Sequence, residues 1–148
     1  MAVAEIAARS SSAGFAVPVR TPKSKRRGRR WTTVAVAAEF PPAVAVMEVK
    51  EGHLNGGNVC QGGALFTLAD LAIAALMNCS GQLTFGISNS LMFVSSARLG
   101  DVLRAEATMV ADHHKIPAVE VVVTNQEGRT ICHVTGMGYR KPSPLPQH

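Results

Sequence analysis

The stretch that decides the fold is residues 51–78, EGHLNGGNVCQGGALFTLADLAIAALMN. Its first part, residues 51–63, is rich in glycine and asparagine, which favours a loop with positions that need special backbone angles. From Ala64 to Met77 only Thr67 and Asp70 are polar, and this segment is too long for a typical strand. We therefore expect a loop followed by a helix. Because the helix is apolar all round, we expect other structure to enclose it.

Short segments rich in β-branched residues flank this helix and predict strands, one before it and four after it. The predicted strands are residues 43–50, 85–95, 101–111, 118–124 and 129–140. The spacing of the last four fits an antiparallel meander, with turns at Gly100-Asp101 and a tight hairpin at residues 125–128. One helix wrapped by five antiparallel strands predicts a single α+β domain over residues 41–140. A domain this small buries only about two-thirds of its surface, which favours pairing with a second copy.

The basic charge of the chain lies outside this domain. The formal net charge is +5, but residues 1–40 hold eight Lys and Arg against two acids, whereas residues 41–148 hold seven against eight. The domain alone therefore gives no electrostatic reason to expect a nucleic-acid partner. No apolar run reaches the roughly 18 residues that a membrane span needs. The last segment, residues 141–148, is polar and Pro-rich, and it predicts a disordered tail.

The leader, residues 1–38, is rich in Ala, Ser, Val and Arg and contains one acid. This composition is typical of chloroplast and mitochondrial transit peptides, with residues 36–38 as a candidate cleavage site. One alternative is a disordered basic extension. Another is a patch for nucleic acid or anionic lipid at residues 23–30, which no interleaved aromatic residue supports. We therefore expect a cytoplasmic or organellar protein.

Asp70 is the first candidate for chemistry, because an ionised carboxylate in an apolar helix costs on the order of several kcal/mol unless it is paired. A structural role, with Ser, Asn or backbone donors holding the carboxylate, is the alternative. Gly62 and Gly63 leave backbone N–H groups uncovered at the positive end of the helix dipole. Such donors stabilise an oxyanion in acyl transfer.

Spacing along the helix constrains how these groups work together. Asp70 lies eight residues after Gly62, about 12 Å along a helix that rises ~1.5 Å per residue. A catalytic carboxylate and an oxyanion donor must each lie about 3 Å from one reacting centre. If both act, they therefore come from two copies of the chain.

The other reactive side chains form no recognised constellation. The three cysteines lack a CxxC pair, which argues against a disulfide scaffold and a structural zinc site. Cys60 is predicted to be a small buried thiol, and His113-His114 a solvated turn without metal-ligand spacing. There is no P-loop, dinucleotide fingerprint or GxSxG motif.

Residues 53–70 closely resemble the signature of hotdog-fold acyl-CoA thioesterases of the PaaI-like branch, which runs roughly Asn, five residues, His-Gly-Gly, then Leu-Ala-Asp on the central helix. The likeness covers residues 43–140, and the turn at residues 95–101 also fits. The resemblance implies a hotdog dimer, usually assembled into a homotetramer as a dimer of dimers. It also implies hydrolysis of an acyl-CoA substrate without a metal or bound cofactor.

The same resemblance assigns roles by position. Asp70 resembles the general base that activates water, or the nucleophile, and Gly62 resembles the oxyanion amide. Asn55 resembles the residue that positions the water or the thioester carbonyl, and Ser88 a water-holding hydroxyl. Gln61 departs from the family, which usually has His there. Its amide still donates to a carbonyl oxygen but cannot take a proton.

The first hypothesis is therefore hydrolysis of an aryl- or medium-chain acyl-CoA, with Asp70 activating water and the amide of Gly62, next to Gly63, holding the oxyanion with help from Gln61. From charge alone, the candidates for the nucleotide phosphates are Arg98, Lys115 and Arg140.

The alternative is a non-catalytic hotdog module that binds acyl-CoA. It is favoured by Gln61 and by the leader in place of the family's N-terminal helix. A hotdog dehydratase or hydratase is a third possibility, but it needs a His at the helix entry.

Overall fold

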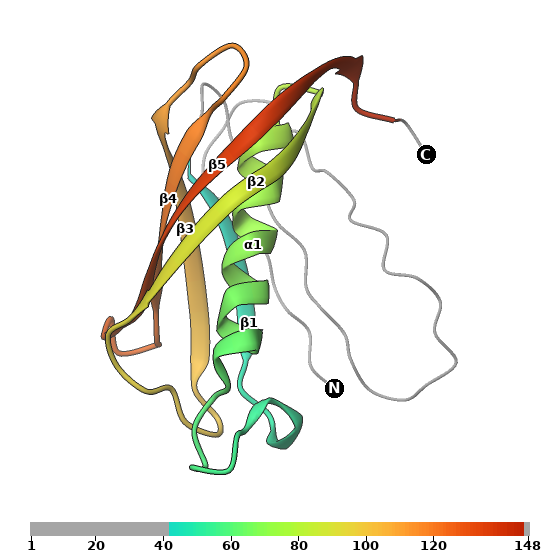
Figure 1. The fold of residues 1–148 in the computed structure, drawn as a ribbon. Helices are drawn as coiled ribbons and strands as arrows, with labels where there is room; N and C mark the ends of the chain where they lie inside the picture. Colours follow the sequence, from blue (N-terminus) through green and yellow to red (C-terminus); the bar gives the residue numbers. More distant parts are fainter. Residues whose placement is uncertain (1–41, 147–148) are drawn as a thin grey trace, which may run out of the picture.

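The structure is a computed structural model that describes residues 42–146, and in it a curled five-stranded sheet wraps around one long helix (Figure 1). The elements in chain order are β1 (Ala43–Glu48), the 3-10 turn η1 (Glu51–His53), α1 (Gly62–Asn78), β2 (Gln82–Phe93), β3 (Val102–Ala111), β4 (Ala118–Thr124) and β5 (Thr130–Pro144). The predicted α+β architecture is confirmed. The predictions for residues 1–40 lie outside the described residues.

The strand order is β1-β3-β4-β5-β2, and all neighbouring strands are antiparallel. The predicted meander is correct for β3, β4 and β5 but wrong for β2, which pairs with β5 at the far edge. The reason is the position of α1 on the concave face of the sheet (Figure 1). The helix carries the chain from one edge strand, β1, across to the other edge, where β2 begins.

The C-terminal segment is also more ordered than predicted. β5 continues to Pro144, so residues 141–144 form part of a strand and not a disordered tail. Gln82 pairs with Pro144, and Gln82 Nε2 donates a hydrogen bond to the Lys141 carbonyl at 3.0 Å. Proline is tolerated here because, within the described residues, the last backbone hydrogen bond on the β4 side of β5 runs from the Arg140 N–H to the Lys115 carbonyl, so a proline beyond it on that side loses no ladder bond.

The core lies between α1 and the concave face of the sheet. Burial alternates along the strands, with Val119, Val121 and Val123 of β4 facing the helix. β1 and β3 contribute small side chains, where Ala43 pairs with Ala107 and Ala45 with Ala105. These alanines let the large side chains of α1 approach the sheet; the largest fully buried ones are Leu68, Ile73, Leu76 and Met77.

One face of α1 remains open, contrary to the prediction that other structure encloses it. Phe66, Thr67, Asp70 and Ala74 are exposed, and their spacing of three or four residues places them on one side of the helix. Asp70 is therefore not a buried carboxylate within one chain. No helix in the described part of the chain is long and apolar enough to cross a membrane.

Asn78 ties the end of α1 to the start of β2. Its Oδ1 accepts a hydrogen bond from the Thr84 backbone N–H at 2.8 Å, and its Nδ2 donates to the Thr84 carbonyl at 3.1 Å. Gly81 makes the turn between them with a φ of 78°, which favours glycine. β2 therefore runs back along α1, and this decides which of its side chains meet the helix.

Candidate active site

Asp70 and Asn89 form the polar centre of the open face of α1. Asn89 Nδ2 donates a hydrogen bond to Asp70 Oδ1 at 3.1 Å. On β5, Gly136 pairs with Asn89, and a Cβ at this glycine would lie 2.6 Å from Asn89 Oδ1. The carboxylate is thus held on one side by an amide, while the side chain as a whole is exposed.

Sequence reasoning singled out Ser88 and missed Asn89. The structure does not bring Ser88 to Asp70 of its own chain, because neighbouring strand residues point to opposite faces. Ser88 pairs with the exposed Met137. The cause is a register shift between Gly86 and Ser88, which inverts the alternation of β2 from that point on.

The start of α1 presents two free backbone donors. The N–H groups of Gly62 and Gly63 donate no hydrogen bond within residues 42–146, whereas the next two, of Ala64 and Leu65, donate to the Gln61 carbonyl at 3.0 and 3.3 Å. This is the normal state of a helix N-terminus, and it makes the position suitable for an anionic oxygen.

The loop before α1 positions Asn55 and Gln61. Asn55 Oδ1 accepts hydrogen bonds from the backbone N–H groups of Gly57 at 2.8 Å and Val59 at 3.4 Å. Its oxygen therefore stabilises the loop, and its NH₂ group remains to donate to a substrate carbonyl or a water. Gln61 is the N-cap residue, but its exposed side chain makes no cap hydrogen bond, so its amide is also available at the helix start.

Asp70 and Gly62 remain well separated in one chain. Both belong to α1, which runs unbroken from Gly62 to Asn78. Eight residues at ~1.5 Å per residue separate them by about 12 Å along the axis. One reacting carbonyl cannot contact both groups of the same chain.

The predicted phosphate-binding side chains do not lie together. Arg98 is exposed in the turn before β3, close to the helix start, because the Ala97 carbonyl accepts a hydrogen bond from the Cys60 N–H at 2.8 Å. Lys115 is at the other end of the domain, where its carbonyl accepts from the Arg140 N–H at 2.8 Å. Arg140 itself is buried and paired with Asp112, so it is not a phosphate ligand.

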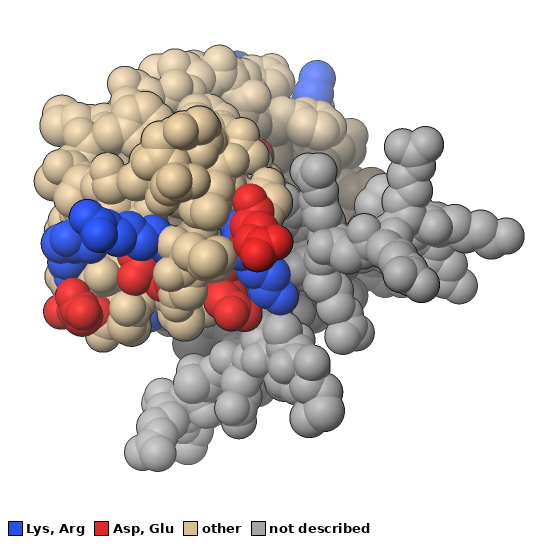
Figure 2. All heavy atoms as spheres, turned by 90° about the horizontal axis from the view of Figure 1, so that it is seen from below, with Lys and Arg blue, Asp and Glu red and all other residues tan. Residues whose placement is uncertain are grey.

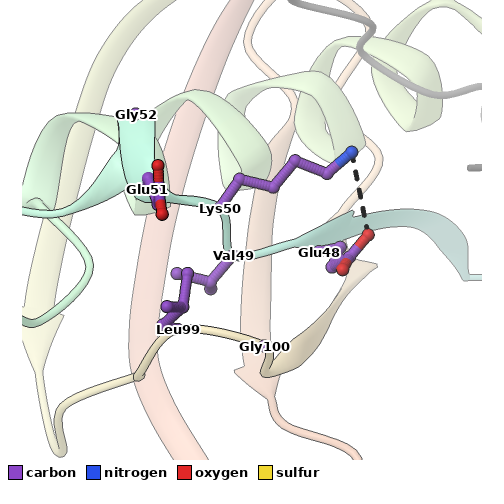
Figure 3. Close-up of a pocket in the computed structure, with 7 residues that line it drawn as sticks. All are labelled: Glu48, Val49, Lys50, Glu51, Gly52, Leu99 and Gly100. Atoms are coloured by element: carbon purple, nitrogen blue, oxygen red, sulfur yellow. Dashed lines mark ion pairs between the residues drawn. The ribbon is translucent and has the colours of Figure 1, made fainter.

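A surface hollow near the helix start does not contain the predicted site. Its lining includes an ion pair between Lys50 Nζ and Glu48 Oε2 at 3.7 Å (Figure 3). All of its lining residues come from the end of β1, the η1 turn and the loop before β3: Glu48, Val49, Lys50, Glu51, Gly52, Leu99 and Gly100. With two carboxylates against one ammonium, it does not favour an anion.

The charges at this end of the molecule are mixed. Figure 2 views the end that carries the loop before α1, and acidic and basic side chains lie next to each other on its described surface. Within residues 42–146 no group of His, Cys, Asp and Glu side chains could hold a metal ion.

Comparison with known proteins assigns this chain to a protein family. The family model described as the thioesterase superfamily matches residues 51–132, more than half of the chain. The chain belongs to the thioesterase superfamily. The matched segment contains the loop before α1, all of α1, strands β2 to β4 and the first residues of β5. It therefore includes Asp70, Gly62 and Gly63.

Individual relatives of this chain refine the assignment. A protein of Archaeoglobus fulgidus, provisionally named an esterase, is 38% identical over 100 residues, which cover 68% of this chain and 65% of that protein. The acyl-coenzyme A thioesterase PaaI of Escherichia coli is 31% identical over 98 residues, 66% of this chain and 70% of that protein. This chain therefore spans about two-thirds of the length of either relative.

Solved structures agree with the sequence relatives. The structure of E. coli PaaI matches with a TM-score of 0.69 and 28% identity, covering 71% of this chain and 76% of that one. A protein of Streptococcus pneumoniae named a hypothetical thioesterase, solved with coenzyme A, matches with a TM-score of 0.67 and 26% identity, covering 71% of this chain and 81% of that one. The predicted hotdog fold and the PaaI-like branch are thereby confirmed.

Two cysteines of the domain, Cys60 and Cys132, have the environment of structural thiols. Cys60 is buried, as predicted, and burial raises the pKa of its thiol, with a smaller contribution from the charge of Asp101. Burial also raises the pKa of the Cys132 thiol to about 11. A thiolate nucleophile at either position is disfavoured, which leaves Asp70 as the candidate reactive group.

Proposed function

We propose that this protein hydrolyses acyl-CoA thioesters by attack of a water molecule that Asp70 activates. The observation that carries the proposal is the arrangement on α1, with an exposed carboxylate in its middle and two uncovered backbone donors at its start. Asp70 acts as general base, and the amide of Gly62 holds the oxyanion formed when water adds to the carbonyl. The named activity of E. coli PaaI and the coenzyme A in the S. pneumoniae structure support acyl-CoA as substrate.

The site is shared by two copies of the chain. The separation of about 12 Å between Asp70 and Gly62 along one helix requires this if both act on one carbonyl. β2 supports the proposal because, among the strands of residues 42–146, it lies at the edge of the sheet with one side of its backbone unpaired. Large apolar side chains are also exposed along β2, and pairing with a second copy would bury apolar surface there: Phe85, Ile87, Met92 and Phe93.

Asn55 and Gln61 complete the proposed site at the helix start. The NH₂ groups of both side chains are available there to donate to the thioester carbonyl. Since Gln61 cannot take a proton, Asp70 is the group that accepts the proton from water. Arg98, exposed beside the helix start, is the proposed contact for the phosphates of coenzyme A.

Release of free thiol from aryl- and medium-chain acyl-CoA tests the proposal. We expect the wild-type protein to release thiol and Asp70→Asn to reduce kcat by about 10²–10⁴-fold, as is typical for loss of a general base. Equal rates in both proteins would reject the mechanism. Tight acyl-CoA binding without any thiol release by the wild type would instead support a non-catalytic binding module, which the amide at Gln61 favours.

A further inference from the structure

We infer that Asn89 is a positioning residue that fixes the orientation of the Asp70 carboxylate, and that Gly136 provides the space it needs. This inference rests on the function proposed above. Its basis is the hydrogen bond of 3.1 Å from Asn89 Nδ2 to Asp70 Oδ1, which joins β2 to the open face of α1.

The side-chain amide of Asn89 can donate a hydrogen bond to Asp70 in only one of its two flipped orientations. An ionised carboxylate accepts hydrogen bonds and does not donate them, so the NH₂ group must face Asp70. The carbonyl oxygen, Oδ1, is then buried and has no hydrogen-bond partner within residues 42–146. A buried acceptor without a partner destabilises a fold. The contribution of Asn89 therefore lies in its contact with Asp70 and not in stabilising the core.

Gly136 makes this arrangement sterically possible. It pairs with Asn89, and a Cβ at this position would lie 2.6 Å from Asn89 Oδ1 and 3.0 Å from Ile73 Cδ1. Any larger residue would push the amide away from its present position. The same register that turns Ser88 away from the helix thus places Asn89 against a glycine.

Orientation matters here because Asp70 is exposed. An exposed carboxylate rotates freely unless one of its oxygens is held. With Oδ1 held by Asn89, Oδ2 makes no hydrogen bond in the described part of the chain and is directed to the water it activates. A catalytic group that is misplaced by about 1 Å loses up to about 10²-fold in rate.

Steady-state kinetics and thermal unfolding of matched variants test the inference. Asn89→Leu keeps the number and branching of the side-chain heavy atoms but removes both the donor and the unpaired oxygen. We expect it to lower kcat by about 10- to 100-fold, to change KM by less than about threefold, and to leave Tm unchanged or raised. A residue with only a structural role would lower Tm and would not lower kcat selectively.

Gly136→Ala and Gly138→Ala provide a second, sterically matched pair. A Cβ at Gly138 would also be crowded, at 2.6 Å from Met77 Sδ and 2.8 Å from Thr84 Cγ2, but these atoms do not contact Asp70. We expect Gly136→Ala to lower kcat as Asn89→Leu does, whereas Gly138→Ala lowers Tm and keeps kcat.

Wild-type kcat in Asn89→Leu, or equal kcat in the two glycine variants, would overturn the inference. Asp70→Asn in the same assay separates this outcome from failure of the proposed function. If Asp70→Asn is inactive and Asn89→Leu is fully active, only the role of Asn89 is wrong. If Asp70→Asn retains wild-type activity, the proposed mechanism itself is wrong.

Discussion

The ring of Phe93 lies over the first residue of α1 and distinguishes the two glycines there. A Cβ at Gly62 would lie 2.6 Å from Phe93 Cζ, whereas a Cβ at Gly63 would meet nothing within 4 Å. Phe93 is 62% exposed in one chain. Gly62 is thus required for close packing, while Gly63 is free to carry a side chain as far as space is concerned.

Substitution of each glycine by alanine measures this difference. Gly63→Ala should raise the free energy of unfolding by up to about 1 kcal/mol, because alanine is the better helix former and no atom obstructs its Cβ. Gly62→Ala has the same propensity gain but must displace Phe93, which costs about 1 kcal/mol or more. Urea denaturation of the two variants gives the values. Equal stability of both variants would contradict the packing of Phe93 on Gly62.

At the scale of elements, the helix and the turns were predictable from local sequence. The apolar run from Ala64 to Met77 predicted α1, and the hairpin at residues 125–128 forms as expected. There Asn125 Oδ1 accepts hydrogen bonds from the Glu127 and Arg129 N–H groups at 3.1 and 3.0 Å. Both features depend on residues that are close in sequence, so their physical causes are visible in the sequence itself.

The register of β2 could not be predicted in the same way. Its shift between Gly86 and Ser88 arises from pairing with β5, some fifty residues later in the chain. One such shift exchanges the two faces of a strand. The shift is why Asn89, and not Ser88, lies beside Asp70 of the same chain; the family resemblance assigns Ser88 by position alone. The edge position of β2 is likewise a property of the whole sheet.

The turn before β3 is an element whose stability depends on pH. Hydrogen bonding from the Arg98 backbone N–H, at 2.8 Å, is the main cause that lowers the pKa of the Asp101 carboxyl, and Gln126 Nε2 adds a second bond at 3.1 Å. The Asp101 carbonyl also accepts from the Val49 N–H at 2.8 Å, which joins this turn to the end of β1.

Asp101→Asn should therefore lower stability at neutral pH and have little effect in acid. A lowered pKa in the folded state means that the carboxylate stabilises the fold above its unfolded pKa, near 4. This contribution disappears as the pH falls through the folded value. For a half-buried group near the surface we expect about 0.5–1 kcal/mol. Urea denaturation between pH 3 and pH 7 measures it. A stability difference that persists at low pH would contradict the role of the ionised carboxylate.

At the scale of the whole molecule, charge and chemistry lie in different parts of the chain. Residues 41–148 carry seven Lys and Arg against eight acids, while residues 1–40 hold the excess of basic residues. The proposed site depends on α1, its preceding loop and β2, all within the segment that matches the thioesterase superfamily. The overall basic charge therefore says little about the substrate.

A single chain also holds the two halves of the site apart. Asp70 lies midway along α1, with Asn89 of β2 beside it. Gly62 lies at the start of the helix, about 12 Å away by the rise of a helix. We propose that a second copy uses the edge of β2, with its exposed apolar side chains, to bring the start of its own α1 to Asp70. Such a two-fold pairing creates two equivalent sites.

Mixing two inactive variants tests the shared site most directly. Asp70→Ala removes the base and Gly62→Val obstructs the oxyanion donor, so each protein alone should release almost no thiol from acyl-CoA. After the two are refolded together, half of the dimers are mixed and one of their two sites is intact, so about a quarter of the wild-type activity should return. A mixture of Asp70→Ala with Asp70→Asn is the control and should remain inactive. If the first mixture also remains inactive although mixed dimers have formed, the two halves of the site do not come from different chains.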